Sequence, residues 1–322
     1  MTVVDDAAPL AAGSRLARLV PRLACPSCRG TVRATGAGLV CVGCGTAYAV
    51  HGEMVVMLDP TSAREIGAAR HDAENVRLRA RLGRTPWLLW WADRLRPPHP
   101  FLFLTSRANR RAFSQMVAGA GRDPVFLDIG SGLLKGLNAT GLSSYVSQHL
   151  VPLEIAPGPG IGIVGDAHRL PWGDGSVDGV LIQGVLEHVH EPERVVMEIA
   201  RVLKPGAPVY AEVPFLQHFH LDPIDFRRYT VDGFEYLFRA YERVDSGVVA
   251  GPASALADML TEFPALLFRS PALYWGAKVV SGWLTSPLKF LDILWGRLPR
   301  AHIAAGGVYF LGRRRGSISE AG

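Results

Sequence analysis

The stretch Val125-Phe126-Leu127-Asp128-Ile129-Gly130-Ser131-Gly132 decides the fold. It reads as an apolar strand that ends in an acidic residue and two closely spaced glycines. Glycine permits a tight turn and lets a ligand approach the backbone closely. The stretch lacks the pattern of a dinucleotide site, and Leu134 stands where another closely spaced glycine is expected. The stretch therefore predicts the first strand of an α/β sheet with a ligand-binding turn, but alone it does not identify the ligand.

Short apolar runs alternate with amphipathic stretches from Pro124 onward, which is the rhythm of a mostly parallel sheet. Further strands are predicted at 151–155, 162–164, 177–182 and 208–213, and two more at 243–249 and 307–311. A helix is predicted over 192–203, because its apolar residues share one helical face before Pro205-Gly206 stops it. The predicted fold class is α/β, a Rossmann-like, doubly wound, mostly parallel sheet.

Acidic residues and further motifs follow the first strand in a fixed order. Glu154 ends the second strand, where a carboxylate can accept the hydroxyl groups of a ribose. The remaining motifs are Gly165-Asp166-Ala167, Ser176-Val177-Asp178, Gly184-Val185-Leu186-Glu187-His188-Val189 and Arg201-Val202-Leu203-Lys204-Pro205-Gly206. These motifs together make the first strand much stronger evidence for a cofactor-binding sheet than it is alone.

This ordered series resembles the class I S-adenosylmethionine-dependent methyltransferases, in the ubiquinone-type branch of small-molecule enzymes, over residues 124–235. The resemblance implies S-adenosyl-L-methionine as the cofactor. It further implies that one set of residues binds it: Asp128, Gly130, Gly132 and Gln183 at the methionine end, Glu154 at the ribose, and Asp166 with Ala167 at the adenine. The chain departs from the family in having glutamate at 154 and in lacking the third glycine. The alternative is a sheet of this kind that no longer binds the cofactor.

All four cysteines lie in one short segment, as the pairs Cys25-Pro-Ser-Cys28 and Cys41-Val-Gly-Cys44. Each pair forms a tight turn that presents two thiolates, and four thiolates suit tetrahedral zinc. The alternative is two disulfides or inert buried cysteines. Together with the residues up to 58, the segment resembles the small zinc-ribbon activator subunit of tRNA and protein methyltransferases, without the helical insertion of the eukaryotic subunit. We expect a zinc ribbon that acts within its own chain.

Polar and titratable side chains crowd the segment that follows the fifth strand, from Pro214 to Thr230. In open α/β sheets ligands bind at the carboxyl ends of strands. His220, supported by Asp225, is the candidate base that removes a proton from the acceptor, since a histidine near neutral pKa suits that role. Alternatively, Asp225 and Arg228 form a structural pair that closes the loop. His188 is a rival base near the cofactor pocket, where it could instead orient its loop.

Tryptophans and basic residues interleave in two segments outside the predicted strands. Trp87, Trp90 and Trp91 precede the sheet, and Trp275, Trp283 and Trp295 lie in an apolar insertion over 251–303. Such patterns are typical of interfacial helices on membranes, and also of a lid whose helices pack on each other. Peripheral contact with the inner membrane face is therefore one interpretation of these segments.

The composition indicates a folded, cytoplasmic protein of about two domains at roughly 150 residues each. Of 322 residues, 48% are hydrophobic and 20% are charged, and the net charge of +5 permits but does not demand an anionic partner. Neither a secretory signal nor a spanning helix is visible. The expected organisation is a flexible lead-in (1–20), the zinc ribbon (21–58), a helical connector (59–118), the methyltransferase core (119–250), the hydrophobic helical insertion (251–303), and the last strand with the tail (304–322).

The predicted function is methylation of an oxygen or nitrogen on a small or lipid-linked acceptor. Two alternatives stay open. One is an RNA methyltransferase that uses the ribbon for recognition, although the basic residues are dispersed rather than gathered in one groove. The other is a scaffold that keeps the sheet without turnover.

Overall fold

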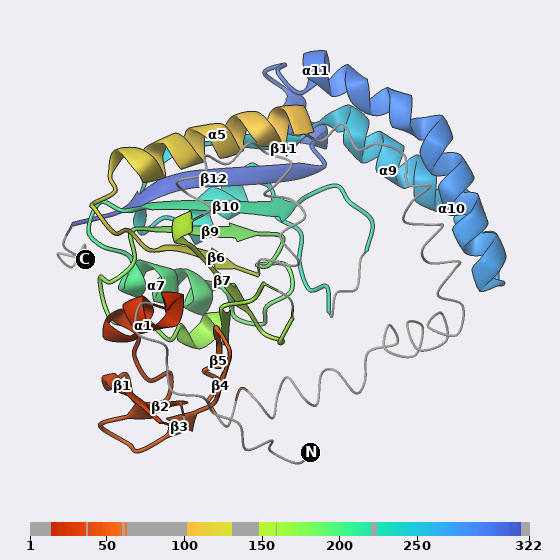
Figure 1. Cartoon of the computed structure of the whole chain (residues 1–322). Helices are drawn as coiled ribbons and strands as arrows, with labels where there is room; N and C mark the ends of the chain where they lie inside the picture. Colours follow the sequence, from red (N-terminus) through yellow and green to blue (C-terminus); the bar gives the residue numbers. More distant parts are fainter. Residues whose placement is uncertain are drawn as a thin grey trace.

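The computed structural model describes residues 14–36, 38–59, 62, 102–130, 148–158, 160–219 and 224–316 (Figure 1). Its centre is a nine-stranded sheet in the order β11-β12-β10-β9-β6-β7-β8-β5-β4. The strands are β4 (Val50–His51), β5 (Met54–Val56), β6 (Phe126–Ile129), β7 (Leu150–Glu154), β8 (Ile163–Val164), β9 (Gly179–Gln183), β10 (Pro208–Pro214), β11 (Tyr241–Ala250) and β12 (Gly307–Arg314). The six strands from β10 to β5 pair in parallel, whereas β12, β11 and β4 run antiparallel to their neighbours. The predicted fold class is confirmed.

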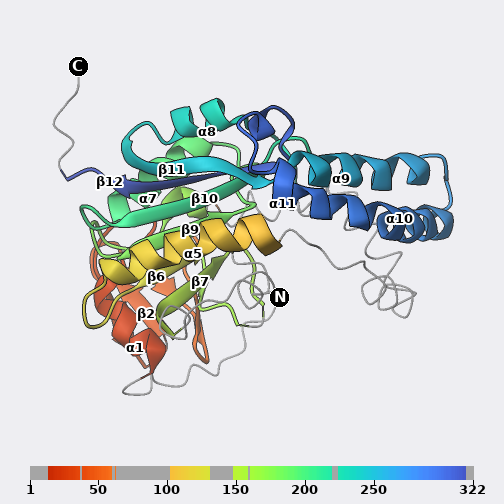
Figure 2. The ribbon, with the colours of Figure 1, turned by 90° about the horizontal axis from the view of Figure 1, so that it is seen from above.

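Helices cover both faces of the sheet, as the alternation of side chains along each strand requires (Figures 1 and 2). On one face, α5 (Leu102–Ala118) packs Phe113 and Met116 against Phe126 and Leu181. On the other face, α7 (Pro192–Val202) and α8 (Val231–Leu237) bury apolar residues in the larger core. The helix predicted over 192–203 is confirmed, with Pro192 in its first turn, where a missing N–H costs nothing.

The cysteine segment is joined to the main sheet. The short helices α1 (Arg15–Leu19) and η1 (Val20–Arg22) lead into an antiparallel three-stranded sheet of β1 (Val32–Thr35), β2 (Gly38–Cys41) and β3 (Ala47–Tyr48). The chain then continues into β4 and β5, and β5 pairs in parallel with β8. Two expectations need correction. Residues 14–20 form a capped helix with buried Leu16 and Leu19 rather than a flexible lead-in, and residues 50–56 extend the main sheet.

A helical hairpin stands between β11 and β12, as the sequence predicts for an apolar insertion before the last strand (Figure 2). It comprises α9 (Pro252–Ala265) and α10 (Pro271–Thr285), followed by η3 (Ser286–Leu291), α11 (Asp292–Trp295) and η4 (Ala301–Ala304). Among the described residues, none of the helices has the length and apolar character needed to cross a membrane. Most of the helical connector expected over 59–118 lies outside the described residues, apart from residues 59, 62 and 102–118.

Candidate functional site

The candidate site lies where the strand order reverses. β6 lies within the parallel series, and it pairs with β7 on one side and with β9 on the other. The order of the strands therefore reverses at β6, and open α/β sheets bind ligands at the carboxyl ends of the strands on either side of such a point. Asp128 and Gly130 stand at that end of β6, Glu154 ends β7, and Gln183 ends β9. The fold thus brings four of the predicted cofactor residues to one edge.

Asp128 is a buried carboxyl group in need of a partner. It is 4% exposed, and its Oδ2 atom has no hydrogen-bond partner among the described residues. Burial, followed by the charge of Glu154, raises the pKa of Asp128 to about 7. Two carboxyl groups held near each other in this way repel when both are ionised. A ligand that brings an ammonium group and hydroxyl donors would relieve both the repulsion and the missing hydrogen bond.

The turn after β6 depends on glycine. Gly130 has φ +69°, in the left-handed region, and its N–H donates to the carbonyl oxygen of Leu153 at 2.9 Å. A Cβ atom at this position would lie 2.1 Å from Cγ2 of Val185, in the loop after β9. Gly130 therefore lets two loops meet at the switch point. Gly132 lies outside the described residues.

Asp166, after β8, is ionised and accepts several hydrogen bonds. Its Oδ1 atom accepts hydrogen bonds from the backbone N–H of His168 at 2.9 Å and from the ring Nδ1 at 2.7 Å. The hydroxyl of Ser62 lies 2.6 Å from its Oδ2 atom. Burial would raise the pKa of Asp166, but the bonds from His168 and Ser62 outweigh it and lower the pKa to about 2. Ala167, the other predicted adenine contact, is buried at the start of η2 (Ala167–Arg169).

A cavity of about 100 Å³ opens beside Asp166. Its lining is polar and comprises Ser62, Asp166, His168, Arg169, His190, Glu191 and Arg194. The rings of His168 and His190 are stacked with their centroids 6.5 Å apart. Flat rings and a fixed carboxylate are groups that suit a planar ligand such as a purine base. Asp166 follows β8, which pairs in parallel with β7, so the cavity lies after the strand next to the one that ends in Glu154.

Sequence reasoning missed a buried polar group on the α5 face of the sheet. Gln183 donates to Oδ1 of the buried Asn109 on α5 at 3.3 Å, and its side chain also bonds to Glu212 on β10. Tyr210 donates to Glu212, and burial raises the pKa of Glu212 to about 7. Asp128, Gln183 and Glu212 fall on this face because each lies two residues from a side chain packed on α5. The period of two along each strand could have predicted the shared face, but not the contact with Asn109.

The loop after β10 is closed by an ion pair. Arg228 donates through both terminal nitrogens to Asp225, whose side chain is buried, and also donates to the backbone carbonyls of Gln217 and His218. These contacts form the pair between Asp225 and Arg228 that the sequence offers as one interpretation of this loop. His220, the candidate base, lies outside the described residues.

The loop after β9 contacts the loop after β10. The backbone N–H of Phe226 donates to the carbonyl oxygen of Glu187 at 2.8 Å. His188 places its Nδ1 atom 2.5 Å from the carbonyl oxygen of Ile224, and its Nε2 atom lies 3.8 Å from Glu187. Burial raises the pKa of Glu187 to about 7. Both ring nitrogens of His188 thus face other residues, an arrangement that orients one loop on the other.

His218 is a second residue that sequence reasoning missed. Its Nδ1 atom lies 2.6 Å from Oδ2 of Asp258, and its Nε2 atom lies 3.3 Å from Oε1 of Glu262. Both acids belong to α9, so His218 joins the loop after β10 to the hairpin. The sequence gives no reason to expect a contact with the hairpin from one of the histidines at 218 and 220 rather than the other. Only the position of α9 shows that His218 makes such a contact.

The four cysteines form one cluster in which all four Sγ atoms lie within 4.8 Å of one another. The Sγ atoms of Cys25 and Cys44 are 3.6 Å apart, and those of Cys28 and Cys41 are 3.4 Å apart. A disulfide needs about 2.05 Å, whereas thiolates about 2.3 Å from one tetrahedral ion stand about 3.8 Å apart. The backbone N–H groups of Gly30 and Cys44 also donate to cysteine sulfurs. The cluster has the donor set and the spacing of a tetrahedral metal site.

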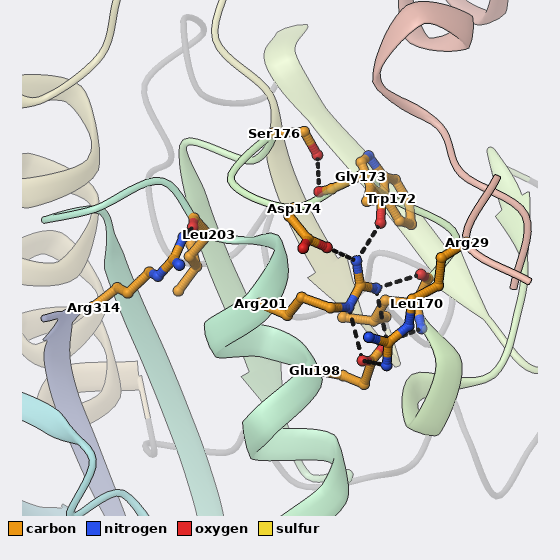
Figure 3. A network of polar contacts seen from close by, with 10 residues as sticks. All are labelled: Arg29, Leu170, Trp172, Gly173, Asp174, Ser176, Glu198, Arg201, Leu203 and Arg314. Carbon is orange, nitrogen blue, oxygen red and sulfur yellow. Dashed lines mark hydrogen bonds and ion pairs between the residues drawn. The ribbon is translucent and has the colours of Figure 1, made fainter. Parts of the chain in front are cut away.

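The cysteine cluster is connected to α7 by charged groups (Figure 3). Arg29 follows Cys28 with φ +61° and pairs with Glu198 at 3.2 Å. Glu198 also pairs with Arg201, which donates to Asp174 and to the carbonyl oxygens of Leu170 and Trp172. The turn that holds the cysteines is therefore linked to the loop before β9 and to the helix after it.

Comparison with known proteins agrees with this geometry. A family described as a methyltransferase domain matches residues 127–211. Norajmaline N-methyltransferase of Rauvolfia serpentina is 48% identical over 46 residues, which are 14% of this chain and 16% of that protein. Demethylmenaquinone methyltransferase of Renibacterium salmoninarum is 32% identical over 155 residues, which are 47% of this chain and 55% of that protein. The same enzyme of a Parafrankia strain is 30% identical over 203 residues, 61% of this chain and 77% of that protein.

The chain thus spans about half or less of the length of the first two relatives and about three quarters of the third. Solved structures also match this chain, at 12–18% identity and TM-scores of 0.35–0.41, and the matches cover 64–85% of this chain and 52–99% of the others. The match to the methyltransferase domain and the extent of the Parafrankia match lead to one assignment. The chain belongs to the class I S-adenosylmethionine-dependent methyltransferases.

Proposed function

We propose that this protein methylates a hydroxyl or amine of a small or lipid-linked acceptor. The observation that carries the proposal is the contact between two loops at the edge of the site. Phe226, in the loop after β10, bonds to Glu187, in the loop after β9, beside the predicted cofactor residues. A loop rich in polar and aromatic groups thus lies against the cofactor edge, where an acceptor has to bind.

For the predicted cofactor residues that the structure describes, the surroundings support the roles that we propose. Asp128, with Gly130 and Gly132, would hold the ammonium end of the cofactor, because a buried carboxyl group lacking a hydrogen bond gains most from a cationic donor. Glu154 would accept the ribose hydroxyls, and Asp166 with Ala167 would contact the adenine. Gln183 would line the methionine end from β9. When bound, S-adenosylmethionine supplies an activated methyl group, and the protein aligns the acceptor with it and excludes water.

The relatives point to the class of acceptor. Two are demethylmenaquinone methyltransferases and one is an N-methyltransferase of norajmaline, so their acceptors are a lipid-linked ring and a small molecule. We place this chain with the ubiquinone-type branch on that basis. A compartment that keeps thiols reduced suits the cysteine cluster, and we propose that the protein acts in the cytoplasm.

His220 is the proposed general base. His188 is less suited, because its Nδ1 atom faces the carbonyl oxygen of Ile224 and its Nε2 atom faces Glu187. His220 follows β10 in the loop that Asp225 and Arg228 close, so the role proposed for Asp225 is to hold that loop. A histidine that removes a proton in the transition state contributes about 10²–10⁴-fold in rate.

A methyl-transfer screen tests this function. Purified protein with labelled S-adenosylmethionine is offered a lipid extract, a pool of small polar metabolites, and total RNA. We expect label in the lipid or small-molecule fraction, and His220→Ala should reduce its rate by about 10²–10⁴-fold with unchanged affinity for S-adenosylhomocysteine. Phe219→Ala, at an exposed neighbouring position, is the control. Label in RNA alone would contradict the acceptor class, and full turnover in His220→Ala would remove this residue from the mechanism.

We further propose that Cys25, Cys28, Cys41 and Cys44 bind one zinc ion. The spacing of the sulfurs supports a tetrahedral ion of this kind, and four thiolates with no open position are typical of a structural site. The proposed role of the ion is to stabilise the ribbon and, through Arg29 and Glu198, its position on α7.

A further inference from the structure

The hairpin between β11 and β12 exposes an unusual amount of apolar surface. We call this the insertion surface. Along α9 it follows a single helical stripe, since Leu256, Leu260 and Phe263 recur at spacings of four and three residues, and Leu267 continues that spacing in the turn after the helix. Its members are Leu256, Leu260, Phe263, Leu266, Leu267, Phe268, Leu273, Val280, Trp283, Leu284, Phe290, Leu291, Ile293, Leu294, Trp295, Leu298 and Ile303. Leu267, near the tip, is 81% exposed. In the view from above, the hairpin projects away from the sheet (Figure 2).

Polar side chains fill the space between the two helices. The hydroxyls of Thr261 on α9 and Thr285 on α10 are 2.8 Å apart, and Ser281 donates to the carbonyl oxygen of Thr261 at 2.9 Å. Further along, Glu262 accepts from Tyr274 at 3.0 Å and pairs with Lys278. Helices that pack in water normally bury their leucines and expose their polar groups. This hairpin does the reverse, which is typical of helices that pack in lipid.

The charges of the hairpin are sorted by sign. Its three acidic residues all have partners within the protein: Asp258 pairs with His218, Glu262 with Lys278, and Asp292 with the backbone at the start of α9. The exposed charged residues over 251–303 are Arg269, Arg297 and Arg300. The exposed charges of the hairpin are therefore all cationic, which complements an anionic lipid surface.

We propose that the insertion surface docks on an anionic membrane, with its apolar side chains in the interfacial layer of one leaflet. The two helices have 14 and 15 residues, so each is about 21–22 Å long at about 1.5 Å per residue. That is shorter than the hydrocarbon core of about 30 Å, so neither helix is long enough to cross the bilayer, and the hairpin lies along the interface of one leaflet. The three arginines meet the lipid headgroups.

Docking brings the loop after β10, which contains the proposed base His220, to the membrane. His218 in that loop contacts Asp258 and Glu262 on α9, so these contacts join the loop to the hairpin. An acceptor held in the bilayer would then reach the cofactor edge from the hairpin side. This consequence rests on the proposed function with a lipid-linked acceptor, and it says from which side that acceptor arrives. The docking of the insertion surface on a membrane does not depend on the proposed function.

Flotation of the full chain with lipid vesicles tests the docking without any turnover. Vesicles of phosphatidylglycerol and phosphatidylcholine in equal parts should bind the protein, and pure phosphatidylcholine should bind it more weakly. The double variant Phe263→Glu/Leu267→Glu should reduce binding to both by at least tenfold, since each buried apolar side chain contributes roughly that much. Replacing Arg269, Arg297 and Arg300 with alanine should reduce binding to anionic vesicles by about a hundredfold.

Met197→Glu is the matched control, because Met197 is 64% exposed on α7, outside the insertion surface. It should leave vesicle binding unchanged, and all variants should keep the wild-type affinity for S-adenosylhomocysteine as proof of folding. Absence of binding by the wild-type protein overturns the proposal, as does full binding by the double variant. A dimer in sedimentation that the double variant dissociates, without vesicle binding, assigns the surface to a second copy and also overturns it.

Discussion

The position and the pKa of Asp128 indicate what kind of ligand group this residue binds. The sequence places it at the end of an apolar strand, and the structure confirms that position on β6. Its protonation could not be predicted, because burial and the approach of Glu154 depend on the pairing of β6 with β7. The same holds for Asp166, an acid of the same type after a neighbouring strand, whose pKa moves to about 2 under its bonds to His168 and Ser62. Strand periodicity locates such groups, and the tertiary structure sets their charge.

The raised pKa of Asp128 predicts that binding of the cofactor releases a proton. With a pKa of about 7, the free protein holds this carboxyl group mostly protonated at pH 6, and an ammonium group favours its ionised form. Calorimetric titration with S-adenosylhomocysteine at pH 6 should therefore give enthalpies that depend on the buffer. Affinity should rise as the pH rises towards 7.

Asp128→Asn should lose that buffer dependence and bind about 10–100-fold more weakly, since it removes a charge-assisted bond of about 1.5–3 kcal/mol. The control is Asp232→Asn, an exposed acid in the first turn of α8. The sign for stability is opposite to that for affinity. Because the folded pKa is raised, the contribution of Asp128 to the unfolding free energy is complete below about pH 4 and is lost as pH rises to about 7. Buffer-independent enthalpy in the wild type would mean that the ligand does not meet this carboxyl group.

At the scale of elements, the strands of the main sheet from β6 onward and α7 follow from local patterns. Apolar runs bounded by turn residues predict β6 to β12 within three residues at their ends, and for the parallel strands β6 to β10 the reason is that burial on both faces demands continuous apolar runs. The start of α9 could be anticipated from Pro252 in its first turn. Its cap could not. The backbone N–H groups of Ala253 and Ser254 donate to the buried carboxylate of Asp292, each at 2.9 Å, and Asp292 stands far along the chain on α11.

This remote cap predicts a stability effect. Asp292→Ala leaves two buried N–H groups without an acceptor and should lower the free energy of unfolding by about 2 kcal/mol in urea titration. Gly251→Ala should also destabilise, since a Cβ atom there would lie 2.2 Å from Oδ1 of Asp292. Asp232→Ala, which removes an exposed acid from the start of α8, should stay within about 0.5 kcal/mol of wild type. Equal stability of Asp292→Ala and wild type would show that the cap is not needed.

At the scale of the whole molecule, the cysteine segment shares its structure with the sheet. β5 pairs with β8, and the buried side chains of Leu39 and Tyr48 belong to the same core as Trp172 and Ile199. The sequence predicts the metal ligands from their spacing alone, because two knuckles in one short segment are local information. It does not predict the union with the sheet, since β5 and β8 are separated by more than a hundred residues and neither has a pattern that selects the other.

The core that the ribbon shares with the main sheet predicts how loss of zinc affects the rest of the protein. Purified protein should contain about one zinc per chain, and Cys28→Ser should lose it. Because ribbon and sheet share one core and are linked by Arg29 and Glu198, the variant should unfold at lower temperature in a single transition, with α7 and β8 less protected from hydrogen exchange. Val42→Ser, an exposed position inside the second knuckle, should keep both zinc and stability. Purified protein that contains no metal would contradict the proposed zinc site. A separate early transition that leaves α7 and β8 fully protected would show instead that the ribbon folds on its own and that its pairing with β8 carries little of the stability of the sheet.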